Sequence, residues 1–197
     1  MPDAPVFALG LALACLAGVR AYLTVLGTGI AALLGWLPAS PETALLTSPW
    51  VLGTAAALAA VEFAADKIPG VDSAWDLVNT LARIPVGAFL ASAAFSPEGE
   101  WSLAAAVLGG TAALTTHALK SGTRVAINAS PEPLSNWLAS SAEDGLVLGG
   151  LALALVAPVL ALGLILLALA LGGWLGWRLL RRFTSRRQRK PLAPSQV

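Results

Sequence analysis

The sequence is poor in charged residues. They make up 12% of its 197 residues, whereas 57% are hydrophobic and the mean hydropathy is +0.76. A soluble domain averages about 25% charged residues, so this chain has too little polar surface to cover a water-soluble globule. We therefore expect an integral membrane protein.

The side chains that most often carry chemistry are also scarce. Cysteine and histidine occur once each, as Cys15 and His117. A single cysteine cannot form an internal disulfide, and two such residues far apart do not make a metal-ligand cluster. The chain has no phosphate-binding glycine loop, nucleophile elbow or zinc-protease helix. We expect no enzyme activity and neither a metal ion nor another cofactor.

Long apolar runs alternate with short polar segments. The first run covers residues 5–37, and as a straight helix it would measure about 50 Å against about 30 Å of hydrocarbon. It must tilt strongly, project from the bilayer or break. Gly18–Arg20 is the expected place for a break, although each half is too short to cross alone. Pro85 predicts a second break, after a short helix over residues 74–83. The second crossing is expected at residues 50–67, and the third continues from the short helix to about Phe95. The last three are expected at residues 103–124, 134–156 and 159–180.

The predicted fold class is therefore all-α: a polytopic transmembrane helical bundle of about six crossings, with residues 1–180 forming a single domain. Two segments of this domain, residues 50–97 and 103–157, align at a constant step that matches Asn79 with Asn136 and Lys67 with Arg124. Each segment contains two crossings, so the copies would share one orientation. They would form a parallel repeat about an axis along the membrane normal.

Basic residues are absent from the predicted loops at one end of the bundle. The loops at 38–49, 96–102 and near 158 contain no Lys or Arg, whereas seven of the twelve basic residues lie between Arg178 and Lys190. The positive-inside rule places the basic ends in the cytoplasm, and six crossings place both termini there. We expect residues 181–197 to form a disordered basic tail that binds anionic lipid headgroups.

Charged side chains inside the predicted crossings form the candidate site. Glu62 and Asp66 share one face of a helix, and His117, Lys120 and Arg124 share a face of another. A lone charge at the bilayer centre costs about 2.5–3.5 kcal/mol, so these side chains should pair around a polar cavity. The residues predicted to line it are Arg20, Glu62, Asp66, Lys67, Asn79, Arg83, His117, Lys120, Arg124, Asn136, Ser140, Glu143 and Asp144.

Two functions fit this pattern. The first is a transporter- or channel-like protein with a charged cavity open to the cytoplasm, which passes a small molecule or an ion. The alternative is a membrane scaffold or assembly protein, with structural salt bridges and a basic tail that binds lipid or a partner. Small residues such as Gly109 and Gly110 allow close helix packing, including that of a homo-oligomer. Nucleic-acid binding is disfavoured, because the short tail offers only Phe183 for stacking.

Several of these segments occur together in a recognisable combination. They are Gly18–Tyr22, Glu62–Asp72, Lys120–Arg124 and Glu132–Asn136, followed by Ser140, Glu143 and Asp144. The combination resembles a bacterial family of membrane proteins catalogued as domain of unknown function 4126. The resemblance covers about residues 10–158 and leaves the last helix and basic tail outside. It implies a location in the bacterial inner membrane and brings no established activity.

Overall fold

The computed structural model describes residues 3–68, 70–95, 102–128 and 133–188, and in these ranges all regular secondary structure is helical. Pro41, Pro49, Pro133 and Pro158 each begin a helix, a position where the missing N–H of proline has no intrahelical partner to lose. The described residues form eight helices: α1 (Ala4–Val19), α2 (Ala21–Leu33), α3 (Pro41–Leu46), α4 (Pro49–Ala65), α5 (Val71–Phe95), α6 (Leu103–Asn128), α7 (Pro133–Val156) and α8 (Pro158–Gln188).

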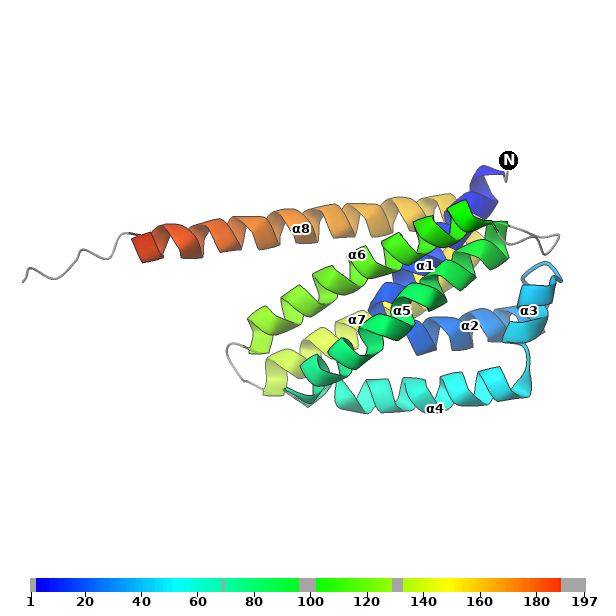
Figure 1. Cartoon of the computed structure of the whole chain (residues 1–197), viewed down its shortest axis with the longest axis horizontal. Coiled ribbons are helices and arrows are strands. Elements are labelled where there is room, and N and C mark those ends of the chain that lie inside the picture. The colour runs from blue at the N-terminus through cyan, green and yellow to red at the C-terminus, as the bar shows by residue number, and fades with distance from the viewer. Residues whose placement is uncertain (1–2, 69, 96–101, 129–132, 189–197) are drawn as a thin grey trace, which may run out of the picture.

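The long helices α4 to α8 run along the bundle in alternating directions (Figure 1). We call the end where α4, α6 and α8 finish the basic end, and the other end, where α5 and α7 finish, the apolar end. Helices α5 and α6 pack tightly against each other and against α1. Most residues of α1 from Ala8 to Val19 are buried, so this helix forms the centre of the fold.

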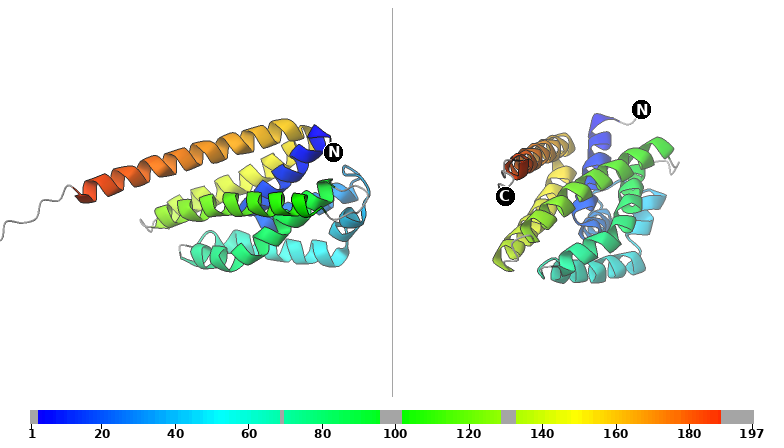
Figure 2. Two further views of the ribbon diagram at one scale, coloured as in Figure 1. Left: turned by 45° about the horizontal axis from the view of Figure 1, so that its top comes forward. Right: turned by 60° about the vertical axis from the view of Figure 1, so that its left-hand side comes forward.

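The first apolar run folds back on itself as a helical hairpin. Helices α1 and α2 meet at Arg20 inside the bundle, and their far ends both lie at the apolar end (Figures 1 and 2). There Phe7 stacks on Phe95 with ring centroids 5.0 Å apart. Val6 of α1 and Thr28 of α2 line the same pocket there. The break is therefore where the sequence predicted it.

The hairpin corrects the expected first crossing. Helices of 16 and 13 residues measure about 24 and 20 Å, less than the roughly 30 Å of a bilayer core. The segment therefore enters and leaves the bundle at the same end. The N-terminus lies at the apolar end, opposite the end of α8 (Figure 2). Both termini were expected in the cytoplasm because this segment was counted as a crossing. A hairpin that returns to the same end does not count as one.

Two further expectations are corrected by continuous helices. Helix α5 runs through Pro85 without ending, because its packing against α1 and α6 outweighs the hydrogen bond that proline removes. Helix α8 continues to Gln188, since residues 178–188 contain neither Gly nor Pro to stop it. Residues 181–188 are thus helical, while the rest of the predicted tail and the predicted turn at 96–101 lie outside the described residues.

Three described helical segments are long and apolar enough to cross a membrane: Val71–Phe95, Leu134–Val156 and Pro158–Arg178. They indicate a membrane protein. Helix α6 has 26 residues but carries more polar side chains, and α4 has 17 residues. Each predicted repeat corresponds to one helical hairpin, α4–α5 or α6–α7. The crossing count and the repeat both stay predictions.

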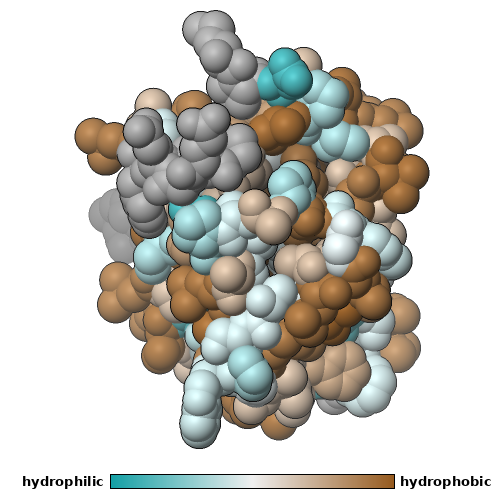
Figure 3. Space-filling model, turned by 90° about the vertical axis from the view of Figure 1, so that its right-hand side faces the viewer, coloured by the Kyte–Doolittle hydropathy of each residue, from teal (hydrophilic) through white to brown (hydrophobic). Residues whose placement is uncertain are grey.

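The bundle is apolar on its outside even where its interior is charged. Leu77 and Leu81 of α5 are 76% and 81% exposed, while Arg83 on the same helix is fully buried. The apolar end presents few strongly hydrophilic side chains (Figure 3). Such a surface suits contact with lipid, and it leaves the polar chemistry to the interior.

Candidate functional site

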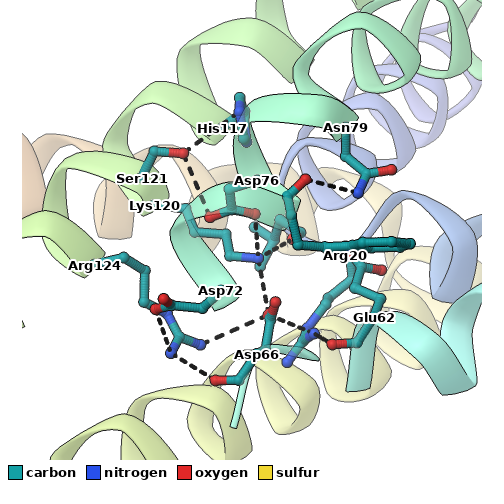
Figure 4. A network of polar contacts seen from close by, with 12 residues as sticks. Arg20, Glu62, Asp66, Asp72, Asp76, Asn79, His117, Lys120, Ser121 and Arg124 are labelled. Atoms are coloured by element: carbon teal, nitrogen blue, oxygen red, sulfur yellow. Dashed lines mark hydrogen bonds and ion pairs between the residues drawn. The ribbon is translucent and has the colours of Figure 1, made fainter. Parts of the chain in front are cut away.

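A cluster of charged side chains fills the interior of the bundle toward the basic end (Figure 4). It includes all five basic residues that precede Arg178, drawn from the α1–α2 break, the end of α4, and helices α5 and α6. Six carboxylates from α4, α5 and α7 lie among them. The ion-pair cluster consists of Arg20, Lys67, Arg83, Lys120 and Arg124 with Glu62, Asp66, Asp72, Asp76, Glu143 and Asp144.

Asp66 lies at the centre of this cluster, at the C-terminal end of α4, and is fully buried. Its Oδ2 is 2.6 Å from Nη1 of Arg20, 3.1 Å from Nζ of Lys120 and 3.7 Å from Nη2 of Arg124. One carboxylate therefore links the hairpin tip to helix α6. Figure 4 shows these contacts converging on Asp66.

The hairpin tip is held by basic side chains from neighbouring helices. The last carbonyls of α1 lack intrahelical donors, and Lys120 donates to Val19 O at 3.2 Å while Arg83 donates to Gly18 O at 3.3 Å. Arg20 itself donates from Nη2 to Ser140 Oγ at 3.0 Å and pairs with Asp144 Oδ1 at 2.9 Å. A break inside a membrane bundle is tolerated when protein groups satisfy the freed backbone in this way.

Arg83 joins α5 to α4 and α6. Its Nη2 lies 2.6 Å from Glu62 Oε1 and 2.9 Å from Asp76 Oδ1, and its Nη1 contacts Nδ1 of His117. A guanidinium has no acceptor, so Nδ1 accepts and the imidazole is neutral with its proton on Nε2. That nitrogen lies 2.7 Å from the Thr80 hydroxyl, which donates onward to the Asp76 carbonyl.

Arg124 fixes α7 to α6. It forms a bidentate pair with Glu143, Nε to Oε1 at 2.9 Å and Nη2 to Oε2 at 2.8 Å, and donates from Nη1 to Asn136 Oδ1 at 2.6 Å. Lys67 lies at the margin of the cluster, 3.3 Å from Ser140 Oγ and 3.7 Å from Asp144 Oδ2. All the predicted cavity residues except Asn79 are thus joined by direct polar contacts.

The two matched asparagines have different surroundings. Asn79 Oδ1 accepts a hydrogen bond from Tyr22 OH at 2.5 Å, and its Nδ2 donates to Trp75 O. Asn136 instead accepts from a charged guanidinium. The two positions are therefore not equivalent contacts of one symmetric site.

Sequence reasoning missed two carboxylates of the cluster. Asp72 accepts from Asn128 Nδ2 at 2.9 and 3.0 Å. Asp76, which pairs with Arg83 and lies 3.1 Å from Lys120 Nζ, was not singled out. With Asn79 and Arg83, these residues recur at helical spacing along a single face of α5, and that periodicity was the signal available in the sequence.

Among the described residues the cluster holds six carboxylates and five basic side chains, and the neutral imidazole of His117 does not offset the difference. Oε2 of Glu62 and Oδ1 of Asp66 are buried without a hydrogen-bond partner, as are the Nε atoms of Arg20 and Arg83. A pocket of about 160 Å³ between α2, α4 and α7 is lined by Arg20, Glu62 and Asp144 together with apolar side chains. In the part of the chain that the structure describes, no three His, Cys, Asp or Glu residues are placed to hold a metal ion.

Comparison with known families gives a match over most of the chain. The family model described as Domain of unknown function (DUF4126) matches residues 7–178. The chain belongs to this family. The match includes the hairpin and α8 up to Arg178, so the DUF4126 region extends further than the expected residues 10–158. No curated protein and no solved structure matches the chain.

Proposed function

We propose that this DUF4126 protein is a small transporter- or channel-like membrane protein whose ion-pair cluster carries a proton. The observation that carries the proposal is the excess carboxylate, with unpartnered oxygens on Glu62 and Asp66. An uncompensated charge in a low-dielectric interior is relieved by taking up a proton or binding a cation. Ionisable residues within membrane helices are, by default, candidates for ion pathways and proton relays.

A proton fits the cluster better than a metal cation. Hard cations require several oxygen ligands converging on one point, and the described residues provide no such group. The carboxylates are instead spread along the bundle, each within ion-pair distance of a basic side chain. The neutral His117 connects to the Asp76 carboxylate through the hydroxyl of Ser121, which lies 3.4 Å from His117 Nε2 and 3.5 Å from Asp76 Oδ2.

The most exposed carboxylates of the cluster lie on α7. Glu143 and Asp144 are 18% and 17% exposed, more than the deeper carboxylates. Toward the apolar end the bundle is closed by packed side chains, among them Leu13, Leu90 and Val147. With the basic end assigned to the cytoplasm by the positive-inside rule, the cluster forms a cytoplasm-facing vestibule in the inner membrane, and the N-terminus lies outside.

Proton flux into proteoliposomes tests this function. The full-length protein is reconstituted with a trapped pH-sensitive dye, and a potassium diffusion potential drives proton entry. We expect flux well above that of empty vesicles, and at least a tenfold loss in Glu62→Gln, which keeps the oxygen that accepts from Arg83. Glu42→Gln is the matched control, because Glu42 is buried outside the cluster, in α3. Wild-type flux no greater than that of empty vesicles would overturn the proposal.

The scaffold alternative is favoured by a different observation. Helix α8 has 31 residues, which measure about 46 Å, and it projects beyond the rest of the bundle at the basic end (Figures 1 and 2). There Arg178 stacks over Trp174, with 4.6 Å between the guanidinium carbon and the ring centroid, and Arg181 over Trp177 at 4.0 Å. Truncation after Arg182 separates the two functions, since a scaffold loses its cellular phenotype while a transporter keeps its flux.

A further inference from the structure

The ion-pair cluster does not account for a cavity of about 420 Å³ between α1, α6, α7 and α8. This volume lies in the range of about 300–1,000 Å³ typical of small-molecule sites. Its walls are mostly apolar, formed by side chains such as Leu16, Leu119, Leu153 and Ile165. We call it the α8 cavity.

The α8 cavity is accessible from the side of the bundle. Helix α8 packs against α1 and α7 but diverges from α6 toward the basic end (Figures 1 and 2). Leu146 and Leu164, which line the cavity, are 46% and 49% exposed. A membrane-dissolved molecule would therefore reach this space from the lipid without passing through the charged interior.

The polar groups lining the α8 cavity are mainly acceptors. The ammonium of Lys120 is directed to Asp66, Asp76 and the Val19 carbonyl. The hydroxyls of Thr116 and Thr123 both donate to carbonyls of their own helix, which leaves their lone pairs as acceptors. Glu143 adds a partly exposed carboxylate, in which each oxygen accepts one hydrogen bond from Arg124 and keeps a further lone pair.

We infer that the α8 cavity binds a long-chain amine: an apolar chain among the leucines with a cationic, hydrogen-bond-donating group at Glu143. The cluster behind Glu143 carries one carboxylate in excess, so a cationic head balances its charge, whereas the carboxylate of a fatty acid would be repelled. This inference goes beyond the proposed function, because binding at the cavity does not require proton flux through the cluster.

Photo-crosslinking to the full-length protein in detergent micelles tests the inference. The probe is hexadecylamine with a diazirine in its chain, and labelled peptides are located by mass spectrometry. We expect saturable labelling of peptides from α6 and α8 that line the cavity. An excess of unlabelled hexadecylamine should reduce that labelling at least tenfold, and palmitate should reduce it less than twofold.

Two glycines provide matched variants. A Cβ on Gly149 would meet open space on the cavity wall, so Gly149→Leu fills the cavity without displacing the backbone. A Cβ on Gly173 of α8 also meets open space, and Gly173 does not line this cavity. We expect Gly149→Leu to lower labelling at least tenfold and Gly173→Leu to leave it within twofold of the wild type.

Glu143→Gln tests the choice of head group. We expect it to remove the preference for the amine over an equally long alcohol probe while labelling by the alcohol persists. Two results would overturn the inference: equal labelling of the Gly149→Leu and wild-type proteins, or competition by palmitate as strong as by the amine. Either result would show that the probe binds the protein only as ordinary boundary lipid does. Proton flux is measured separately, so failure here leaves the proposed function standing.

Discussion

The two ends of the bundle are held together by different forces. Toward the basic end, buried arginines, lysines and carboxylates pair across four helices, and leucines cover the outside. Toward the apolar end, small residues bring backbones together: Gly87 of α5 and Gly109 of α6 face each other directly. Lipid gives no hydrophobic drive between helices, so each half needs another source of cohesion, electrostatic in one and close packing in the other.

The largest effect is expected from Arg83→Met, which keeps an unbranched apolar stem and removes the charge. Glu62 and Asp76 then lose a partner in a cluster that already has an excess of carboxylate. Breaking a buried ion pair costs about 3–5 kcal/mol, visible as a large fall in the thermal unfolding midpoint in detergent.

The control for this substitution is Arg178→Met, at an exposed position on α8, which should change stability by less than about 1 kcal/mol. The excess of carboxylate also predicts an asymmetry, with Glu62→Gln costing clearly less than Arg83→Met. Equal losses from these two variants would contradict the charge balance of the cluster.

A smaller effect separates the two matched asparagines. Asn136→Ala removes a hydrogen bond to the charged Arg124, worth about 1.5–3 kcal/mol, whereas Asn79→Ala removes neutral hydrogen bonds, each worth about 0.5–1.5 kcal/mol. Thermal unfolding of the two variants measures the difference. Matching losses would favour equivalent roles for the two residues, as the repeat predicts.

The apolar end is tested by Gly109→Ala. A methyl group at this position would fall on the Ala91 side chain and on the carbonyl oxygen of Gly87, which is backbone and cannot turn away. Overpacking of this kind costs about 1–3 kcal/mol, measured by the same unfolding assay. Gly122→Ala on the same helix is the matched control, because its Cβ meets open space. A neutral Gly109→Ala would show that α5 and α6 are not in close contact.

The smallest expected effect is that of Tyr22→Phe, which tests how the hairpin is attached to α5. It removes one hydrogen bond, from Tyr22 OH to Asn79 Oδ1, and should cost about 0.5–1.5 kcal/mol. In a double-mutant cycle, Tyr22→Phe should lose most of its effect once Asn79 is replaced by alanine. Additive losses would mean that the two side chains do not interact.

Much of the outline was predictable. The all-helical class, the membrane character and the break at Arg20 follow from composition and length, and helices α4, α6 and α7 begin within one residue of their expected starts. Glu62 and Asp66 were predicted to share a face, as were His117, Lys120 and Arg124, because helical spacing alone fixes that relation.

The hairpin was not predictable from its sequence. An apolar run with one arginine at its centre fits a tilted helix, a kinked helix or a helix that turns back, and the local residues do not choose among them. The choice depends on donors far away in the chain, Arg83 and Lys120, which satisfy the carbonyls that the break exposes.

The sequence by itself determined that this DUF4126 protein is a helical membrane protein and that its ionisable residues must pair, because isolated charges are too costly in hydrocarbon. Only the tertiary structure decided which residues pair and where the N-terminus lies. The tertiary structure also gives the ion-pair cluster one more carboxylate than basic side chains, and it leaves a cavity beside Glu143. These features arise from contacts between residues distant in the chain, and local sequence carries no record of such distances.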